Sequence, residues 1–288
     1  MIVVSLLLVI LAILGAPLFA IIATSAMVGF YNNETELMTM ALELMSIANT
    51  PVLTAIPLFT FAGYVLSESN APQRLVRLTN AMFGWMPGGL ALVCLAACAF
   101  FTAFTGASGV TIIALGAILY PALKQDGYGD RFNLGLVTSS GSLGLLFAPS
   151  LPLILYGVVA DVSIDDLFRA GILPGLVMLV MLGGYSIWVN RHNRKPMGSF
   201  SIREVGAAMR EAIWELPLPF VVLGGIYSGF FAVSEAAAIT ALYVFIAEVL
   251  INREIPMREL PRIVRDSMVL VGGILMILGV SLASTYYM

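Results

Sequence analysis

Two short polar stretches, each flanked by apolar sequence, hold the residues that could do chemistry in this chain. The first is TGASG, residues 105–109, with hydroxyls at Thr105 and Ser108. The second is GSLGLLFAPSLP, residues 141–152, in which glycines and prolines interrupt a helical pattern. Backbone groups released by such breaks in a bilayer need partners, so broken helices are usually buried in protein or line an ion or substrate cavity. Hydroxyls and free carbonyls from two facing breaks would suit a hard cation such as Na⁺ without a buried charge.

The same residues also have a purely structural interpretation. Glycine and serine are common where membrane helices approach one another closely. Residue spacing alone does not decide between a cation site and close helix packing.

Other chemistries find no support in the sequence. There is no phosphate-binding P-loop, and Ser139, Ser140 and Ser142 have no histidine or carboxylate nearby that could activate them. Cys94 and Cys98 share one helix face at a spacing that does not favour a disulfide within a helix, so we expect two buried thiols. We therefore expect no enzyme activity, no organic cofactor and no nucleic-acid partner.

The composition is that of a membrane protein. Of the 288 residues, 60% are hydrophobic and 11% are charged, whereas charged residues make up about 25% of an ordinary soluble domain. The apolar runs are continuous rather than alternating, which excludes a β-barrel. The sequence predicts an all-α polytopic membrane protein surrounded by a lipid bilayer.

Long apolar runs predict about seven spans and one hairpin. A span needs about 20 apolar residues to cross a bilayer core of ~30 Å. The run 2–30 carries no charge and is interpreted as one retained span, because it is too long for a signal peptide. The expected spans are residues 2–30, 50–66, 132–161 (a broken helix), 163–190, 216–231, 235–251 and 267–288.

Residues 88–123 form two apolar arms around the polar tip at residues 105–109. Each arm is barely long enough to cross the bilayer. The arms are either two complete spans or a re-entrant hairpin that stops near the midplane. We favour the hairpin, since the tip has no charge and no strong interfacial anchor.

Two amphipathic stretches and the distribution of basic residues orient the chain. Residues 67–87, with Arg74 and Arg77 on one side, are predicted to lie in the membrane interface. Residues 191–213 form a hydrophilic connector. If this connector is cytoplasmic, 13 of the 14 Lys and Arg residues fall inside and only Arg169 falls outside. The N-terminus is then cytoplasmic.

Several acidic residues have the positions of helix caps. Ser163 with Asp166, and Asn33 with Glu36, have the spacing of capping boxes. Glu235 follows Ser234 at an expected helix start, where a carboxylate favours the helix dipole. A functional carboxylate inside the membrane is the alternative for Glu235.

The chain resembles the large membrane subunit of the tripartite ATP-independent periplasmic (TRAP) transporters. The resemblance runs through the whole chain, in the same order and spacing. It is carried by AIPLFTFAGYVL (55–66), PGGLAL (87–92), TGASGVT (105–111), GSLGLLFAPSLPLILYG (141–157), VSIDDLFRAGILPG (162–175) and GGIYSGFFAVSEAAA (224–238).

The resemblance implies a Na⁺-coupled secondary transporter with an elevator mechanism in the bacterial inner membrane. It also implies two protein partners: a small four-helix membrane subunit and a periplasmic substrate-binding protein that delivers an organic acid such as a C4-dicarboxylate or sialic acid. By resemblance, the Na⁺ site lies between the hairpin tip and the broken helix, at Thr105, Ala107, Gly144, Phe147 and Pro149. The last three would act through backbone carbonyls or through the geometry of the break.

The sequence departs from the family pattern in two motifs and in length. Thr105 and Ala107 stand where hydroxyls are common, and Ala148-Pro149-Ser150 replaces a frequent Pro-Pro-Ser. Family members are longer, so residues 1–190 resemble a first half-repeat and residues 214–288 an incomplete second one. We expect that this chain alone does not transport.

Our mechanistic hypothesis is that Na⁺ holds the hairpin against the broken helix and shapes a substrate site beside Ser108 and Ser150. The alternative is a passive channel or a non-transporting scaffold subunit. The spans show almost no continuous polar lining, which favours the transporter.

Overall fold

The computed structural model describes residues 2–32, 38–86, 88–191 and 200–285, and within these ranges the regular structure is entirely helical. The helices are α1 (Ile2–Ile13), α2 (Leu18–Asn32), α3 (Met38–Ala48), η1 (Pro51–Thr54), α4 (Ala55–Glu68), α5 (Ala71–Phe83), α6 (Gly89–Thr105), α7 (Ser108–Gln125), α8 (Asp130–Leu143), η2 (Gly144–Leu146), α9 (Leu151–Val159), α10 (Ile164–Val189), α11 (Ile202–Glu211), α12 (Pro217–Tyr227), α13 (Val233–Phe245), η3 (Ile246–Ile251) and α14 (Leu260–Thr285).

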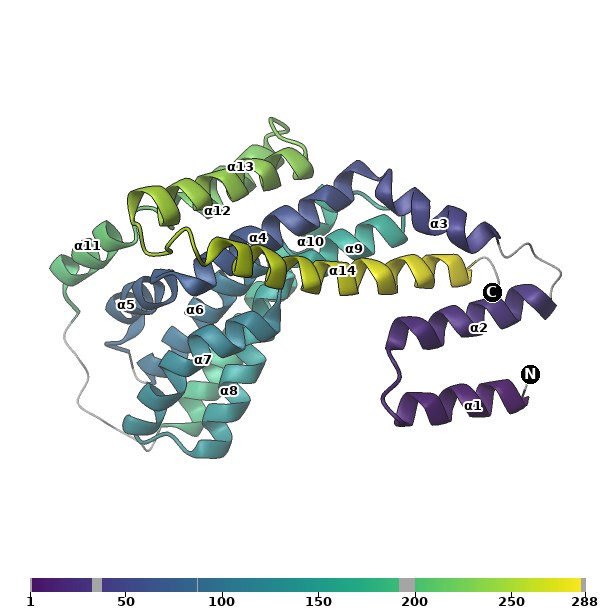
Figure 1. The fold of residues 1–288 in the computed structure, drawn as a ribbon. Coiled ribbons are helices and arrows are strands. Elements are labelled where there is room, and N and C mark those ends of the chain that lie inside the picture. Colours follow the sequence, from purple (N-terminus) through teal and green to yellow (C-terminus); the bar gives the residue numbers. More distant parts are fainter. Residues whose placement is uncertain (1, 33–37, 87, 192–199, 286–288) are drawn as a thin grey trace.

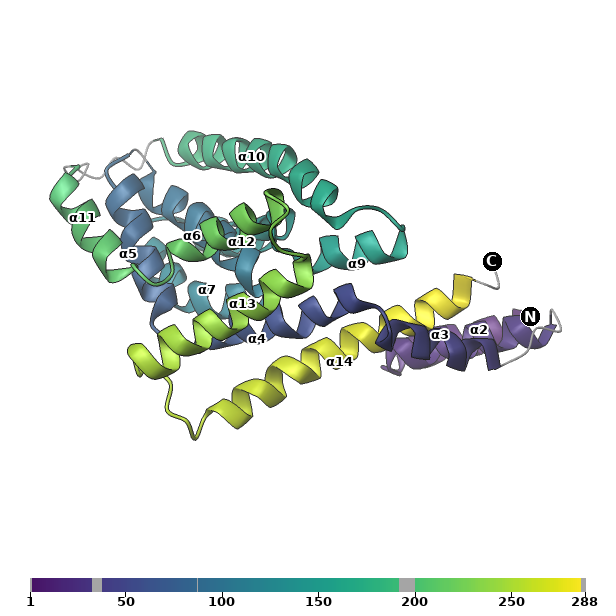
Figure 2. The same cartoon turned by 90° about the horizontal axis from the view of Figure 1, so that it is seen from above.

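Helix α6 is the centre of the fold. Its small and apolar side chains, among them Val93, Leu95, Ala97 and Phe101, are buried almost completely. It packs against α4, α5, α7, α8 and α10. Figure 2 shows α10 and α14 on opposite sides of the molecule, with α4, α6, α7, α12 and α13 between them. The element that ends in the polar tip is therefore enclosed by protein.

The expectation of a helical membrane protein is confirmed, but about seven spans is too many for the described residues. Five helices there are long and apolar enough to cross a bilayer, or six if the bent pair of α8–η2 with α9 counts as one span. One of the six is α7, an arm of the expected hairpin, so five of the seven expected spans are found. At the C-terminal end, α12 has only 11 residues and is too short to count as a span. The prediction of a full span at residues 216–231 is therefore not met.

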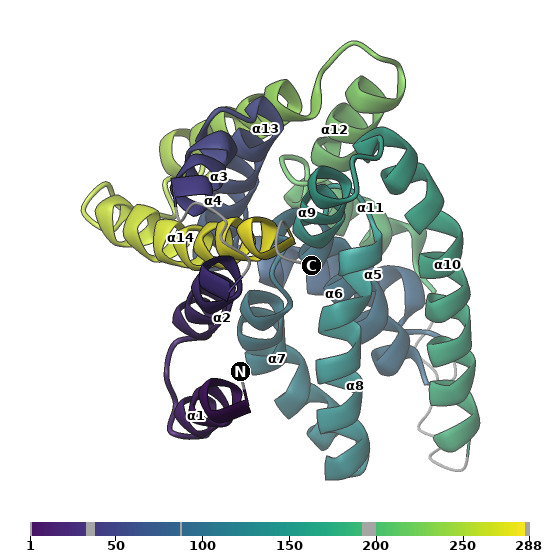
Figure 3. The same cartoon turned by 90° about the vertical axis from the view of Figure 1, so that its right-hand side faces the viewer.

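The interpretation of residues 2–30 as one span is wrong. The structure divides this run into α1 and α2, of 12 and 15 residues. The chain reverses at Gly15, whose φ is +86°, just before Pro17. Glycine adopts this conformation without strain, and proline near a helix start favours a new helix. Figure 1 shows α1 folded back beside α2, and Figure 3 shows α1 on the far side of α2 from α14.

The start of the last helix also differs from the expectation. Helix α14 begins at Leu260, seven residues before the expected start at Ser267, and its first turns carry Arg262. This charge lies at the helix end and pairs with Glu68 at 2.8 Å. The proposed capping box of Asn33 and Glu36 and most of the basic part of the connector (192–199) lie outside the described residues.

Capping at the other sites is as expected. The Ser163 hydroxyl accepts a hydrogen bond from the Asp166 amide at 3.3 Å. The Glu235 carboxylate accepts one from the Ala232 amide at 3.0 Å, which supports the capping interpretation of Glu235. Cys94 and Cys98 are buried and free.

Candidate functional site

The hairpin tip is a two-residue turn. Helix α6 ends at Thr105 and α7 begins at Ser108, so Gly106 and Ala107 make the connection. Gly106 has a φ of +62°, a left-handed conformation that suits glycine. A Cβ placed there would also lie 2.7 Å from the Leu151 side chain at the start of α9. The tip is thereby held directly against the second half of the broken helix.

The break between α8 and α9 is also local. After η2, Phe147 and Ser150 have extended backbone conformations, and α9 then leaves at 48° to the direction of α8. The Phe147 amide donates to the Gly144 carbonyl at 3.1 Å. The Ser150 hydroxyl donates to the Leu145 carbonyl at 2.6 Å. The backbone groups that the break releases are therefore partly hydrogen-bonded within the loop itself.

The tip and the break pack against one another. A Cβ on Gly144 would lie 2.6 Å from the Ala99 carbonyl oxygen and 2.8 Å from the Ala103 amide nitrogen. Such distances to backbone atoms leave no space for a side chain. On the other side of the tip, Gly63 of α4 contacts Thr105. A Cβ placed on Gly63 would lie 3.0 Å from the Cβ of Thr105. The hairpin tip is thus enclosed between α4 and the broken helix.

Three buried threonines link the two breaks. The Thr102 hydroxyl lies 2.8 Å from the Thr111 hydroxyl and donates to the Gly141 carbonyl at 3.0 Å. The Thr111 hydroxyl lies 3.1 Å from that of Thr105. This Thr102–Thr105–Thr111 network connects both arms of the hairpin to α8 through neutral oxygens.

Thr105 and Ala107 bring a hydroxyl and a carbonyl oxygen together at the tip. The Thr105 hydroxyl is 3.5 Å from the carbonyl oxygens of Thr102 and Ala107, at the long limit for a hydrogen bond. The Ala107 carbonyl accepts from the Thr111 amide at a long 3.3 Å. The Ala107 carbonyl is therefore only weakly engaged, whereas the Thr105 hydroxyl also lies 3.1 Å from the Thr111 hydroxyl.

The other sequence-predicted residues have different positions. Gly144 and Pro149 are buried in the break, and the Ala148–Pro149 peptide bond is cis. The Phe147 ring packs against Gly175 of α10, and a Cβ placed on Gly175 would lie 2.7 Å from the Cζ of Phe147. Only the backbone of Phe147 could therefore serve an ion. Ser108 is half-buried at the start of α7 with its carbonyl oxygen toward Gly141, whereas Ser150 bonds within its own loop.

Residue spacing did not identify Thr102, Thr111 or Thr60 as part of this region. Thr102 and Thr111 flank the tip on the two arms, so the pattern of threonines at 102, 105 and 111 was the available signal. Thr60 lies one turn before Gly63 on α4, on the helix face that meets the tip. It is buried, and its hydroxyl has no hydrogen-bond partner among the described residues.

The electrostatics of the site suit a cation that is held by uncharged groups. The C-terminal ends of α6 and of α8–η2 meet there, and helix C-termini carry partial negative charge. The N-termini of α7 and α9 follow directly, and helix N-termini favour anions. Within the described residues, no group of His, Cys, Asp or Glu side chains could hold a metal ion. Neutral oxygens and helix ends are therefore the polar groups that the described part of this region presents.

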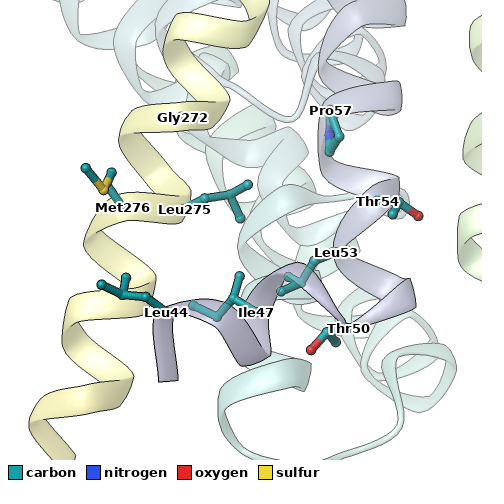
Figure 4. Close-up of a pocket in the computed structure, with 9 residues that line it drawn as sticks. All are labelled: Leu44, Ile47, Thr50, Leu53, Thr54, Pro57, Gly272, Leu275 and Met276. Atoms are coloured by element: carbon teal, nitrogen blue, oxygen red, sulfur yellow. The ribbon is translucent and has the colours of Figure 1, made fainter. Parts of the chain in front are cut away.

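A separate cavity of about 480 Å³ lies between α3, α4 and α14 (Figure 4). Its walls are mostly apolar, and the hydroxyls of Thr50 and Thr54 donate to the carbonyls of Ser46 and Pro51. Because its described lining has only these two polar side chains and no charged one, we do not assign the site to it. The lining residues are Leu44, Ile47, Thr50, Leu53, Thr54, Pro57, Gly272, Leu275 and Met276.

A broken membrane helix with uncharged polar groups packed against it is typical of membrane transporters. The comparison with known families is more specific. The chain belongs to the family described as "Tripartite ATP-independent periplasmic transporter, DctM component", whose model matches residues 2–288. This is a family of transporter permeases rather than enzymes, as the resemblance indicated.

Curated relatives carry names with different solutes. The chain is 34% identical over 257 residues to the C4-dicarboxylate TRAP transporter large permease protein DctM of Rhodobacter capsulatus, covering 83% of this chain and 58% of the relative. It is 34% identical over 255 residues to the ectoine/5-hydroxyectoine TRAP transporter large permease protein UehC of Ruegeria pomeroyi, covering 87% and 60%. It is 36% identical over 212 residues to the isethionate TRAP transporter permease protein DctMQ of Oleidesulfovibrio alaskensis, covering 73% and 33%. The chain thus spans about three-fifths of the length of the first two relatives.

Proposed function

We propose that the complete protein is the large permease subunit of a Na⁺-coupled importer in the bacterial inner membrane, with its N-terminus in the cytoplasm. Its partners are a small four-helix membrane subunit and a periplasmic substrate-binding protein. Family membership supports the permease role. The observation that carries the Na⁺ proposal is the Thr102–Thr105–Thr111 network, which joins the hairpin tip to the broken helix through neutral oxygens.

In this proposal Na⁺ binds the Thr105 hydroxyl, the Ala107 carbonyl and backbone carbonyls of the break at Gly144, Phe147 and Pro149. Bound Na⁺ neutralises the helix C-termini that meet there and fixes the hairpin against α8 and α9. The N-termini of α7 and α9, with Ser108 and Ser150, then face the substrate.

We propose a small solute with an anionic group as the substrate. The relatives' names include dicarboxylates, ectoine and isethionate, and all of these bear a carboxylate or a sulfonate. Helix N-termini bind such groups without a basic side chain. An organic acid is therefore the class that the α7 and α9 N-termini fit best.

Uptake by the complete transporter in vesicles, with its binding protein and small subunit, tests the proposal. We expect Thr105→Val to weaken Na⁺-dependent uptake at least tenfold, since valine keeps the volume of threonine but removes the oxygen. Thr138→Val is the matched control, because Thr138 is exposed on α8 and bonds only to carbonyls of its own helix. Unchanged Na⁺ dependence in Thr105→Val would reject the assignment of this residue, and uptake that needs no Na⁺ gradient would support the passive channel instead.

A further inference from the structure

An ion-pair cluster that shares no residue with the hairpin tip contains more carboxylates than cations. Arg74 of α5 lies among Glu215, just before α12, Glu248 of η3, and Glu254 in the loop that follows. We call these four residues the Arg74 cluster. Glu215 and Glu248 are 2% and 1% exposed, and they are the only carboxyl side chains among the described residues that are fully buried. If all three acids were ionised, the cluster would hold a net formal charge of −2 with two of its carboxylates fully buried, which is strongly unfavourable.

The hydrogen-bond donors around each carboxyl group show which acid is short of partners. Both Glu254 oxygens accept, one from Arg74 and the other from the Asn70 amide at 2.7 Å. Both Glu248 oxygens lie 3.1 Å from an Arg74 nitrogen, and the Asn252 side-chain amide donates to one of them at 3.3 Å.

Glu215 is different, since only its Oε1 is engaged, by Arg74 at 2.5 Å. Its Oε2 is buried with no hydrogen-bond partner among the described residues. An ionised carboxylate oxygen without a donor is a costly buried group, whereas a protonated one carries no charge. We propose that Glu215 binds a proton on Oε2 at neutral pH and that this proton site controls the attachment of α5 to the α12–α13 segment.

A proton fits the cluster better than a metal cation does. No three acidic, histidine or cysteine side chains in the described part of the chain could hold a metal ion. The three carboxyl groups converge on the guanidinium, so they leave no shared position for a cation. Glu215 Oε2 is a single free oxygen, which suits a proton and is too little for Na⁺.

The charged and titratable groups around Glu215 come from each neighbouring element. They are Arg74 on α5, Glu248 on η3, Glu254 in the following loop and Tyr243 on α13. The Tyr243 hydroxyl donates to the Trp214 carbonyl at 2.9 Å and so does not serve the acid. Burial raises the pKa of Glu215 above its ordinary value against the opposing effect of Arg74. Burial also acts to raise the pKa of Glu254, but the Asn70 amide and Arg74 outweigh it and hold that pKa low.

The infrared spectrum of the purified chain in detergent tests the proposal directly, because the C=O stretch of a protonated carboxyl is separate from the carboxylate bands. At neutral pH we expect one such band in the unmodified protein and its loss in Glu215→Gln. Glu211→Gln is the control, because Glu211 is half-exposed and pairs with Arg77 one turn further along α5, so the band should remain. Absence of the band from the unmodified protein, or its survival in Glu215→Gln, overturns the proposal.

Thermal unfolding as a function of pH provides a second readout from the same variants. In the unfolded chain Glu215 loses its proton near pH ~4.3, whereas the folded protein keeps it to higher pH. Between these two values the unfolding equilibrium constant rises by up to about tenfold per pH unit because of this one proton. Glu215→Gln removes that dependence, so its stability should fall less steeply than that of the unmodified protein as the pH rises above about 5. Parallel pH profiles for the two proteins overturn the proposal.

Discussion

The hairpin tip and the Arg74 cluster both bury polar groups between helices that are distant in sequence, but with different chemistry. At the tip, three threonine hydroxyls and several carbonyls interact at 2.8 to 3.5 Å, and no side chain there carries a formal charge. In the Arg74 cluster, one guanidinium meets three carboxyl groups, two of them fully buried. The tip can gain a cation without first losing one, whereas the cluster already contains its cation and has surplus acid.

The hairpin tip can therefore exchange hydrogen bonds for a bound ion, whereas the Arg74 cluster holds helices together. Hydrogen bonds between neutral groups contribute little individually and can be exchanged for an ion. Removing one partner from a buried ion pair leaves an uncompensated charge. Substitutions in the two regions should therefore differ in kind: those in the cluster affect stability first, and those at the tip affect Na⁺ dependence first.

The largest effect is expected for Arg74→Met. Methionine fills much of the volume but leaves Glu248 and Glu254 without their cation, at a cost of roughly 3–5 kcal/mol in the free energy of unfolding. Thermal or denaturant unfolding of the purified chain in detergent measures this loss. A loss below about 1 kcal/mol, the range of exposed pairs, would show that the cluster does not hold α5 to the α12–α13 segment.

A smaller but still substantial effect is expected for Gly144→Ala. The added methyl group meets the backbone of Ala99 and Ala103, so α6 and the break must separate, at a cost of roughly 1–3 kcal/mol. Na⁺ dependence of the complete transporter should weaken as well, because the tip moves away from the break. Gly135→Ala on α8 is the matched control, since a Cβ there meets nothing within 4 Å. Equal behaviour of the two variants would refute the close contact.

The smallest effect is expected for Arg77→Met. Arg77 is also on α5 and also pairs with a glutamate, Glu211, but both side chains are about half-exposed, at 51% and 45%. Exposed pairs contribute about 0–1 kcal/mol. Unfolding measurements should therefore separate Arg77→Met clearly from Arg74→Met. If the two variants were equally unstable, burial would not be the property that distinguishes these two ion pairs.

The sequence predicted the hairpin tip and the broken helix because their signals are local. Gly106 in the tip, and Gly144 with Pro149 in the break, are residue types that favour helix ends, and the structure has both interruptions at those positions. The assignment of individual Na⁺ and substrate ligands within these breaks remains a prediction.

Other features depend on hydropathy or on distant contacts, and these were harder to predict. The division between α1 and α2 was missed because continuous apolar sequence concealed the turn signal at Gly15 and Pro17. Arg74 was assigned to an interfacial helix face, but its partners lie 141 to 180 residues away in sequence. No local pattern contains such a pairing, so the Arg74 cluster could come only from the structure.

Na⁺-specific stabilisation of the purified chain tests the central proposal most directly, because the tip and the break are both within it. Thermal unfolding would be measured in NaCl and in choline chloride at equal ionic strength, for the unmodified protein and for Thr105→Val. A ligand that binds only the folded state stabilises it by RT ln(1 + [L]/Kd). We predict a higher unfolding midpoint in NaCl for the unmodified protein and no such difference for Thr105→Val. Equal midpoints in the two salts for the unmodified protein, or the same Na⁺ effect in both proteins, would contradict a cation site at the hairpin tip.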